Sequence, residues 1–88
     1  MRRPDPHRAL LRALKSRVPT LTVLASRTQP WASATFTGAQ HFLDCEPGCD
    51  LAGIEEWEFA LAGHLVADIV AAGDGERVRI EALTIEIA

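Results

Sequence analysis

The sequence predicts an α+β domain in which one N-terminal helix packs on a four-stranded antiparallel sheet. Apolar residues recur at helical spacing between Asp5 and Val18, and apolar and polar residues alternate through most of the chain that follows. The chain has 88 residues, the length of one domain, and we expect that domain to span 1–88 with a flexible arm at 1–4.

The predicted helix has clear start and stop signals. Asp5 is a good N-cap and Pro6 suits the first helical position, whereas Pro19 disfavours helix at Val18. One side of the helix carries the apolar residues Leu10, Leu11, Leu14 and Val18. His7 lies on the same side in the first turn, and we expect it to be a histidine at the edge of the core.

Four segments after the helix have the alternation of half-buried strands: 20–27, 32–43, 56–71 and 77–88. The residues TQPW are predicted as a turn after the first segment, and Asp74-Gly75 suits a hairpin between the last two. The apolar positions of the last segment change phase near Ala82-Leu83, which a β-bulge there would repair. Residues 44–55 are predicted as a long acidic loop between the second and third strands.

If the strands pair in chain order, as in a meander, their register can be predicted by placing large side chains opposite small ones. Leu43 then pairs with Glu56, which sets Gly38 opposite Leu61 and leaves large side chains facing glycines. The same register predicts four further pairs: Ile69 with Ile80, Leu65 with Ile85, His64 with Glu86, and His41 with Glu58.

This order, one helix followed by a four-stranded meander, resembles the cystatin-like class of α+β rolls over the whole chain. The short glycine- and glutamine-containing loop motif of inhibitory cystatins is absent from the sequence. The resemblance therefore implies a fold and no activity.

The net charge of -3 conceals an asymmetry. Up to Pro30 seven Lys and Arg residues accompany one acidic residue, whereas after it two accompany eleven. A basic N-terminal segment can bind nucleic acid or an anionic surface, and Arg8, Arg12 and Lys15 are the candidates, with Arg2 and Arg3 before them. We favour the alternative, a basic helix beside an acidic sheet, because an acidic chain is repelled by phosphate.

The sequence also predicts an interaction surface. In the meander register the sheet face away from the helix carries small and apolar residues between charged ones, and the interface candidates are Ala60, Ala62, His64, Val66 and Thr37. We therefore predict a small bacterial-type interaction module that forms a homodimer or binds a protein partner through this face or an edge strand. The sequence lacks an apolar run of about 18 residues and a signal-peptide core, which predicts a cytoplasmic protein without a membrane segment.

No motif indicates catalysis. The sequence has no phosphate-binding loop, nucleophile elbow or metalloprotease helix, and the predicted His64–Glu86 and His41–Glu58 pairs have no nucleophile beside them. We therefore expect no enzyme activity, no catalytic residue and no cofactor.

The stretch LDCEPGCDL at 43–51 leaves three possibilities open. Folded about Pro47 as a hairpin, it sets Cys45 opposite Cys49, so that a disulfide is reachable. His41 and Asp44 lie close enough in sequence to join the two thiols as metal ligands, although the set is incomplete for zinc. The expected state is a pair of reduced thiols in a loop, as a cytoplasmic protein favours.

Overall fold

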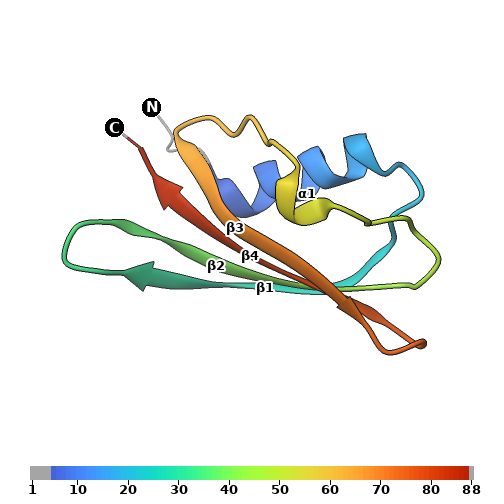
Figure 1. The fold of residues 1–88 in the computed structure, drawn as a ribbon. Coiled ribbons are helices and arrows are strands. Elements are labelled where there is room, and N and C mark those ends of the chain that lie inside the picture. The colour runs from blue at the N-terminus through green and yellow to red at the C-terminus, as the bar shows by residue number, and fades with distance from the viewer. Residues whose placement is uncertain (1–4, 88) are drawn as a thin grey trace.

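The computed structural model describes residues 5–87; the predicted arm at 1–4 and Ala88 lie outside the described residues. One helix is followed by four strands, in the order α1 (Pro6–Arg17), β1 (Val23–Ala32), β2 (Thr37–Cys45), a 3-10 turn η1 (Ile54–Glu56), β3 (His64–Gly73) and β4 (Val78–Glu86). The strands form one antiparallel sheet, and α1 lies across one of its faces (Figure 1). The predicted α+β class, one N-terminal helix on a four-stranded antiparallel sheet, is confirmed.

The order of the strands differs from the predicted meander. It is β1-β2-β4-β3, so that β4 lies between β2 and β3. Because β2 and β3 are both antiparallel to β4, they run parallel to each other. Parallel strands need a crossover connection, and residues 46–63 provide it. The predicted pairing of Gly38 with Leu61 and of His41 with Glu58 is therefore wrong, and the resemblance to cystatin-like rolls stays a prediction.

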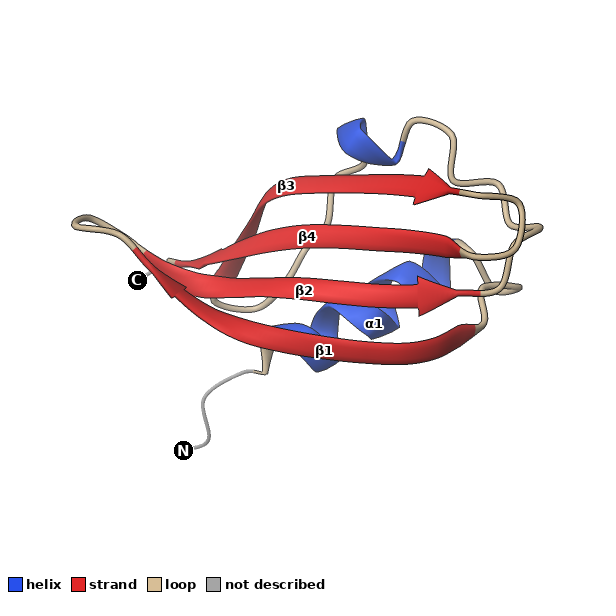
Figure 2. Cartoon of the chain, turned by 90° about the horizontal axis from the view of Figure 1, so that it is seen from below, coloured by secondary structure: helices blue, strands red, loops and turns tan. Residues whose placement is uncertain are grey.

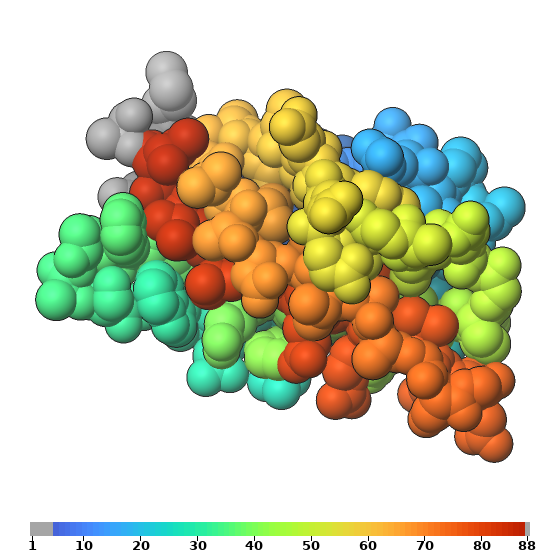
Figure 3. All heavy atoms as spheres, in the orientation of Figure 1, coloured from blue at the N-terminus to red at the C-terminus, as the bar shows by residue number. Residues whose placement is uncertain are grey.

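The crossover explains why residues 56–63 look like a strand in the sequence. Beyond η1 the chain is extended, but it forms no ladder before His64. Trp57, Phe59 and Leu61 alternate because every second side chain packs on the core, with Leu61 fully within it. In the space-filling view the crossover lies against β3 and α1 (Figure 3). Period-two patterning here indicates an extended chain with one packed side, and not membership of the sheet.

The first hairpin turns later than predicted. Residues 28–31, predicted as a turn, lie within β1, and the chain turns at 33–36, where Ser33 Oγ accepts the Phe36 N–H at 3.1 Å. Pro30 is tolerated in a strand because β1 is an edge of the sheet.

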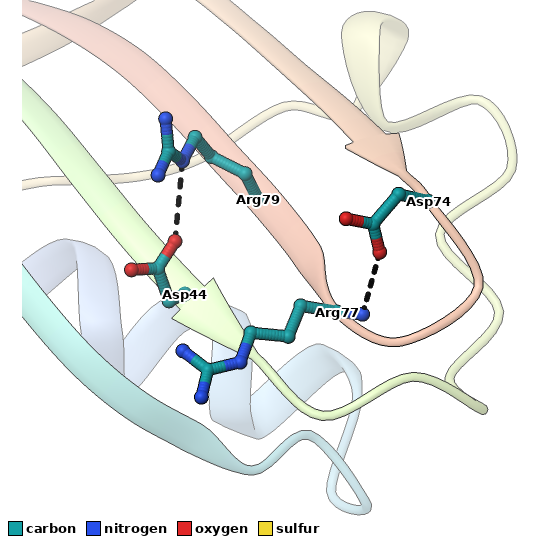
Figure 4. Close-up of polar contacts among 4 residues, drawn as sticks. All are labelled: Asp44, Asp74, Arg77 and Arg79. Atoms are coloured by element: carbon teal, nitrogen blue, oxygen red, sulfur yellow. Dashed lines mark hydrogen bonds and ion pairs between the residues drawn. The ribbon is translucent and has the colours of Figure 1, made fainter.

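The second hairpin follows the prediction more closely. Asp74 Oδ1 accepts the backbone N–H groups of Glu76 and Arg77, both at 2.9 Å, and these bonds lower the pKa of Asp74 (Figure 4). The predicted pairs Leu65–Ile85 and His64–Glu86 are confirmed. Ile69, however, pairs with Ala82 rather than Ile80, because the extra residue is Ala67 in β3 and β4 runs without a bulge.

The core lies between α1, the crossover and one face of the sheet. Leu10 and Leu14 of α1 are fully buried, as the helical pattern predicts. The sheet and the connections supply the rest of this core: Leu21, Leu43, Cys45, Ile54, Leu61, Ile69, Ile80 and Ala82, with Val18 at its edge. Asp5 caps α1 by accepting the N–H groups of His7 and Arg8, as predicted. Each buried leucine contributes about 1.5–3 kcal/mol, so the helix is held mainly by packing.

Gly38→Ala should destabilise the protein severely. A Cβ at this position would lie 1.9 Å from the backbone oxygen of Thr84 on β4, so the two strands would have to separate. We expect a loss of about 1–3 kcal/mol or more, measured as a lower urea midpoint with an unchanged slope. Gly73→Ala is the matched control: its nearest contact is a side-chain methyl of Val78 at 3.4 Å, and its midpoint should stay near that of the wild type. Equal midpoints for the two variants would contradict the described β2–β4 register.

Candidate functional site

The face of the sheet opposite α1 is not covered by any element among residues 5–87 (Figure 2). The register places one row of residues across this face: Trp31 on β1, Gly38 on β2, Ile85 on β4 and Leu65 on β3. Every second residue along each strand lies on the same face of the sheet. The apolar residues of this face, here called the open face, are Trp31, Phe42, Leu65, Val70, Leu83 and Ile85. They come from all four strands, and the polar residues Gln29, Gln40, Asp68 and Glu81 lie among them on the same face.

The open face exposes more apolar surface than a solvated sheet needs. Leu65 is 53 % and Val70 39 % exposed, and the other four side chains are half-buried. Exposed apolar side chains that gather on one face, with polar residues around them, are typical of an interaction site in soluble proteins. Its signal in the sequence is the change of phase in the last segment. Leu83 and Ile85 do not face the core because they belong to the open face. The bulge predicted at Ala82-Leu83 instead kept them on the core side.

Charged groups border the open face. Arg79 Nε donates to Asp44 Oδ1 at 3.1 Å, across β4 and β2 (Figure 4). Arg79 is 62 % exposed, so this ion pair contributes little to stability. The Arg27 guanidinium lies 4.2 Å from the centroid of the Phe42 ring and covers one side of it. The face therefore carries both signs of charge at its borders, and the acidic residues Asp68 and Glu81 lie among its apolar side chains.

A second polar feature lies on the opposite face, beneath the N-terminus of α1. His41 is fully buried, and its Nδ1 lies 2.9 Å from Nδ1 of His7. Its Nε2 lies 2.8 Å from Thr84 Oγ1, and the Thr84 hydroxyl donates to the carbonyl of Ala39 at 3.4 Å. At the other end, His7 Nε2 lies 3.1 Å from Ser26 Oγ.

The carbonyl of Ala39 determines the direction of this chain of hydrogen bonds. A carbonyl only accepts, so Thr84 donates to it and accepts from His41 Nε2–H. A neutral His41 then has its lone pair on Nδ1, where it accepts from His7 Nδ1–H. His7 Nε2 is left as an acceptor for the Ser26 hydroxyl. Every polar group in this chain of hydrogen bonds therefore has a partner when both histidines are neutral.

Burial lowers the pKa of His41 from 6.5 to about 4. The nearby His7 and His64 contribute to this lowering of the pKa, whereas the carboxylate of Asp5 opposes it. His41 is therefore neutral at physiological pH, as the hydrogen bonds require. The sequence placed His7 on the apolar side of the helix, but nothing in it indicates a long-range partner for that ring.

The predicted interface residues do not share one face. His64 and Val66 lie on the side of β3 that faces α1, and His64 Nδ1 donates to the Ala62 carbonyl at 3.0 Å. Ala60 and Ala62 are exposed in the crossover rather than in a strand. Thr37, at the start of β2, donates to Glu86. The predicted set is thus dispersed, because the meander register placed the crossover in the sheet.

The two cysteines are separated by the end of β2. Cys45 is buried in the core, whereas Cys49 is half-buried in the crossover, with Sγ 3.7 Å from Thr20 Oγ1. Both are free thiols, and burial raises the pKa of Cys45, as do the nearby Cys49 and Asp44. Of the possibilities left open by the sequence, the structure has no strand pair about Pro47, because the chain leaves the sheet after Cys45. Among residues 5–87, no three His, Cys, Asp or Glu side chains are placed to hold a metal ion, so Cys45, Cys49, His41 and Asp44 do not assemble into a site.

Part of the basic helix has structural contacts. Lys15 Nζ donates to the Leu21 carbonyl at 2.6 Å, and the Arg17 guanidinium lies 4.3 Å from the centroid of the Trp57 ring. Arg8 and Arg12, the other nucleic-acid candidates, are exposed. Lys15 and Arg17 thus connect the end of α1 to neighbouring segments.

Comparison with protein-family models, with curated proteins and with solved structures finds no match to this chain. Within residues 5–87, the helices lack the length and hydropathy needed to cross a bilayer. The function is therefore inferred from the open face and the histidine pair.

Acid should destabilise the protein through His41. In the folded state the pKa of His41 is about 4, whereas in the unfolded chain it is 6.5. The unfolded state binds more protons between these values, so the free energy of unfolding falls as the pH falls through this window, by about 3 kcal/mol in total. The measurement is the pH dependence of the urea midpoint in the wild type and in His41→Gln.

Carboxylates titrate in the same range, and the difference between these two proteins isolates His41. His64→Gln is the control and should keep most of the dependence, because His64 is the smallest of the causes that lower the pKa of His41. The same slope in the wild type and in His41→Gln would contradict a neutral buried His41.

Proposed function

We propose that this chain is a small interaction module that forms a homodimer through the open face of its sheet. The observation that carries the proposal is the apolar surface contributed by all four strands, with Leu65 and Val70 the most exposed of its side chains. Two free thiols, Cys45 and Cys49, fit a reducing compartment such as the cytoplasm.

Pairing through the sheet edges is the alternative, and both edges oppose it. The β1 edge contains Pro30, which has no N–H group to donate to a second chain. The β3 edge contains the bulge at Ala67, which interrupts the regular row of donors and acceptors. The open face has no comparable obstacle, which favours stacking of two sheets over extension of one.

The open face is self-complementary about a two-fold axis parallel to the strands. Such an axis sets β1 of one copy over β3 of the second, and β2 over β4. Trp31 then lies over Leu65 of the second copy, and Ile85 lies over Gly38, where a glycine leaves room for it. At the border, Asp44 lies over Arg79 of the second copy, so charges of opposite sign meet. Size and charge thus match in the two end rows of the face, whereas in the middle rows Phe42 lies over Glu81 and Leu83 over Gln40 of the second copy.

The size of the open face predicts a weak dimer. Four strands side by side are about 19 Å wide, and the segment 25–31 is about 24 Å long, which gives an area of roughly 450 Å² per copy. The total of roughly 900 Å² lies near the lower limit for a specific interface. We therefore expect a dissociation constant on the order of micromolar and a dimer that depends on protein concentration.

Leu65→Glu should give a monomer. The side chain is 53 % exposed in the single chain, so the fold should survive, but in the stacked dimer the carboxylate would be buried against Trp31 without a partner. Sedimentation velocity across the micromolar range should show a dimer for the wild type and a monomer for the variant. Circular dichroism checks that the variant is folded.

Ala62→Glu is the matched control. Ala62 is exposed in the crossover, away from the open face, so its substitution should leave the dimer intact. A wild type that stays monomeric throughout this range, or a dimer that survives Leu65→Glu and dissociates with Ala62→Glu, would refute the proposal.

A further inference from the structure

The histidine pair ends at a hydroxyl on the surface. Ser26 lies on β1, an edge strand, and is exposed, whereas His7 in the first turn of α1 is half-buried. Ser26 Oγ lies 3.1 Å from His7 Nε2. The helix and the edge strand thus bring together two residues that lie far apart in the sequence.

The hydrogen bonds give this contact a definite polarity. The Ala39 carbonyl accepts from the Thr84 hydroxyl, so this hydroxyl accepts from His41 Nε2–H. His41 then has no proton on Nδ1, where it accepts from His7 Nδ1–H. His7 Nε2 is therefore a basic nitrogen that faces the Ser26 hydroxyl. A hydroxyl beside a base that a third group orients is the arrangement of an activated nucleophile.

We propose that Ser26 is a nucleophilic serine, that His7 is its general base, and that His41 positions the His7 imidazole. The electrophile is a small activated acyl or phosphonyl donor. Ser26 Oγ attacks its carbon or phosphorus atom, and the Oγ–H proton moves to His7 Nε2. The leaving group departs with the electron pair of the broken bond, which leaves an ester on Ser26.

Two groups lie beside the His7 imidazole, to which the proton moves. His41 Nδ1 accepts the Nδ1–H of the imidazolium, and it is neutral because burial lowers its pKa. The carboxylate of Asp5 lies at the same helix terminus, where it accepts the backbone N–H of His7 at 3.0 Å. Of the other groups around the pair, His64 on β3 also disfavours a charged His41, which keeps that ring neutral.

The helix N-terminus does not stabilise an oxyanion. Asp5 Oδ1 accepts the N–H groups of His7 and Arg8, the Asp5 carbonyl accepts that of Ala9, and Pro6 has none. The site therefore combines an activated hydroxyl with no free donor at this terminus. We expect one modification per chain rather than rapid turnover.

The test is labelling with an alkyl fluorophosphonate, followed by intact mass and peptide mapping. We expect one adduct per chain, on Ser26, with loss of fluoride, and no adduct in Ser26→Ala. His7→Gln should slow labelling on the order of 100-fold, as loss of a general base does. Ser33→Ala, which removes a turn serine, should label at the wild-type rate.

Mapping of the wild type compares Ser26 with Ser16 and Ser33 in one folded chain, so the outcome does not depend on a variant that fails to fold. His41→Asn, whose Oδ1 can accept from His7, should keep more of the rate than His41→Leu, which cannot. An unlabelled Ser26, an adduct spread equally over the three serines, or an undiminished rate in folded His7→Gln would overturn the proposal. Because Ser26 lies on the face opposite the open face, monomeric Leu65→Glu should label normally, which separates this test from that of the dimer.

Discussion

The position of β4 between β2 and β3 is the constraint on which the rest of the structure depends. It makes β2 and β3 parallel, and parallel strands in one sheet require a connection that crosses the sheet. Residues 46–63 cross on the side that α1 already occupies (Figure 1). Both covering segments therefore lie on one face, which builds the core there and leaves the other face of the sheet without a cover.

The uncovered face and the covered face have different chemical characters. The covered face buries a histidine pair whose polar atoms are all satisfied, and it ends at the exposed Ser26. The opposite face exposes the apolar residues of the open face, with the charged residues Asp68 and Glu81 among them and an ion pair at the border. One small domain thus has a surface suited to association and a polar site suited to chemistry, separated by the thickness of one sheet.

The sequence predicts the parts of this fold that depend on neighbours along the chain. The Asp5 cap, the apolar side of α1 and the Asp74-Gly75 hairpin are local, and all three are found. The strand order is not local. Trp57, Phe59 and Leu61 alternate as a strand does, since an extended chain that packs one side on a core has the same period. That misassignment moved Ala60, Ala62 and His64 to a face they do not occupy. The His7–His41 contact joins distant segments, and periodicity carries no information about it.

The crossover also has a consequence for folding. The pairs β1–β2 and β3–β4 are hairpins with short turns, and each can form early from its own residues. The central pair, β2–β4, joins these two hairpins and forms only when the loop at 46–63 closes. Its contacts have large sequence separation, which slows folding in small domains. We therefore expect the joining of the two hairpins to limit the folding rate, and the tight β2–β4 contact at Gly38 to be made in that step.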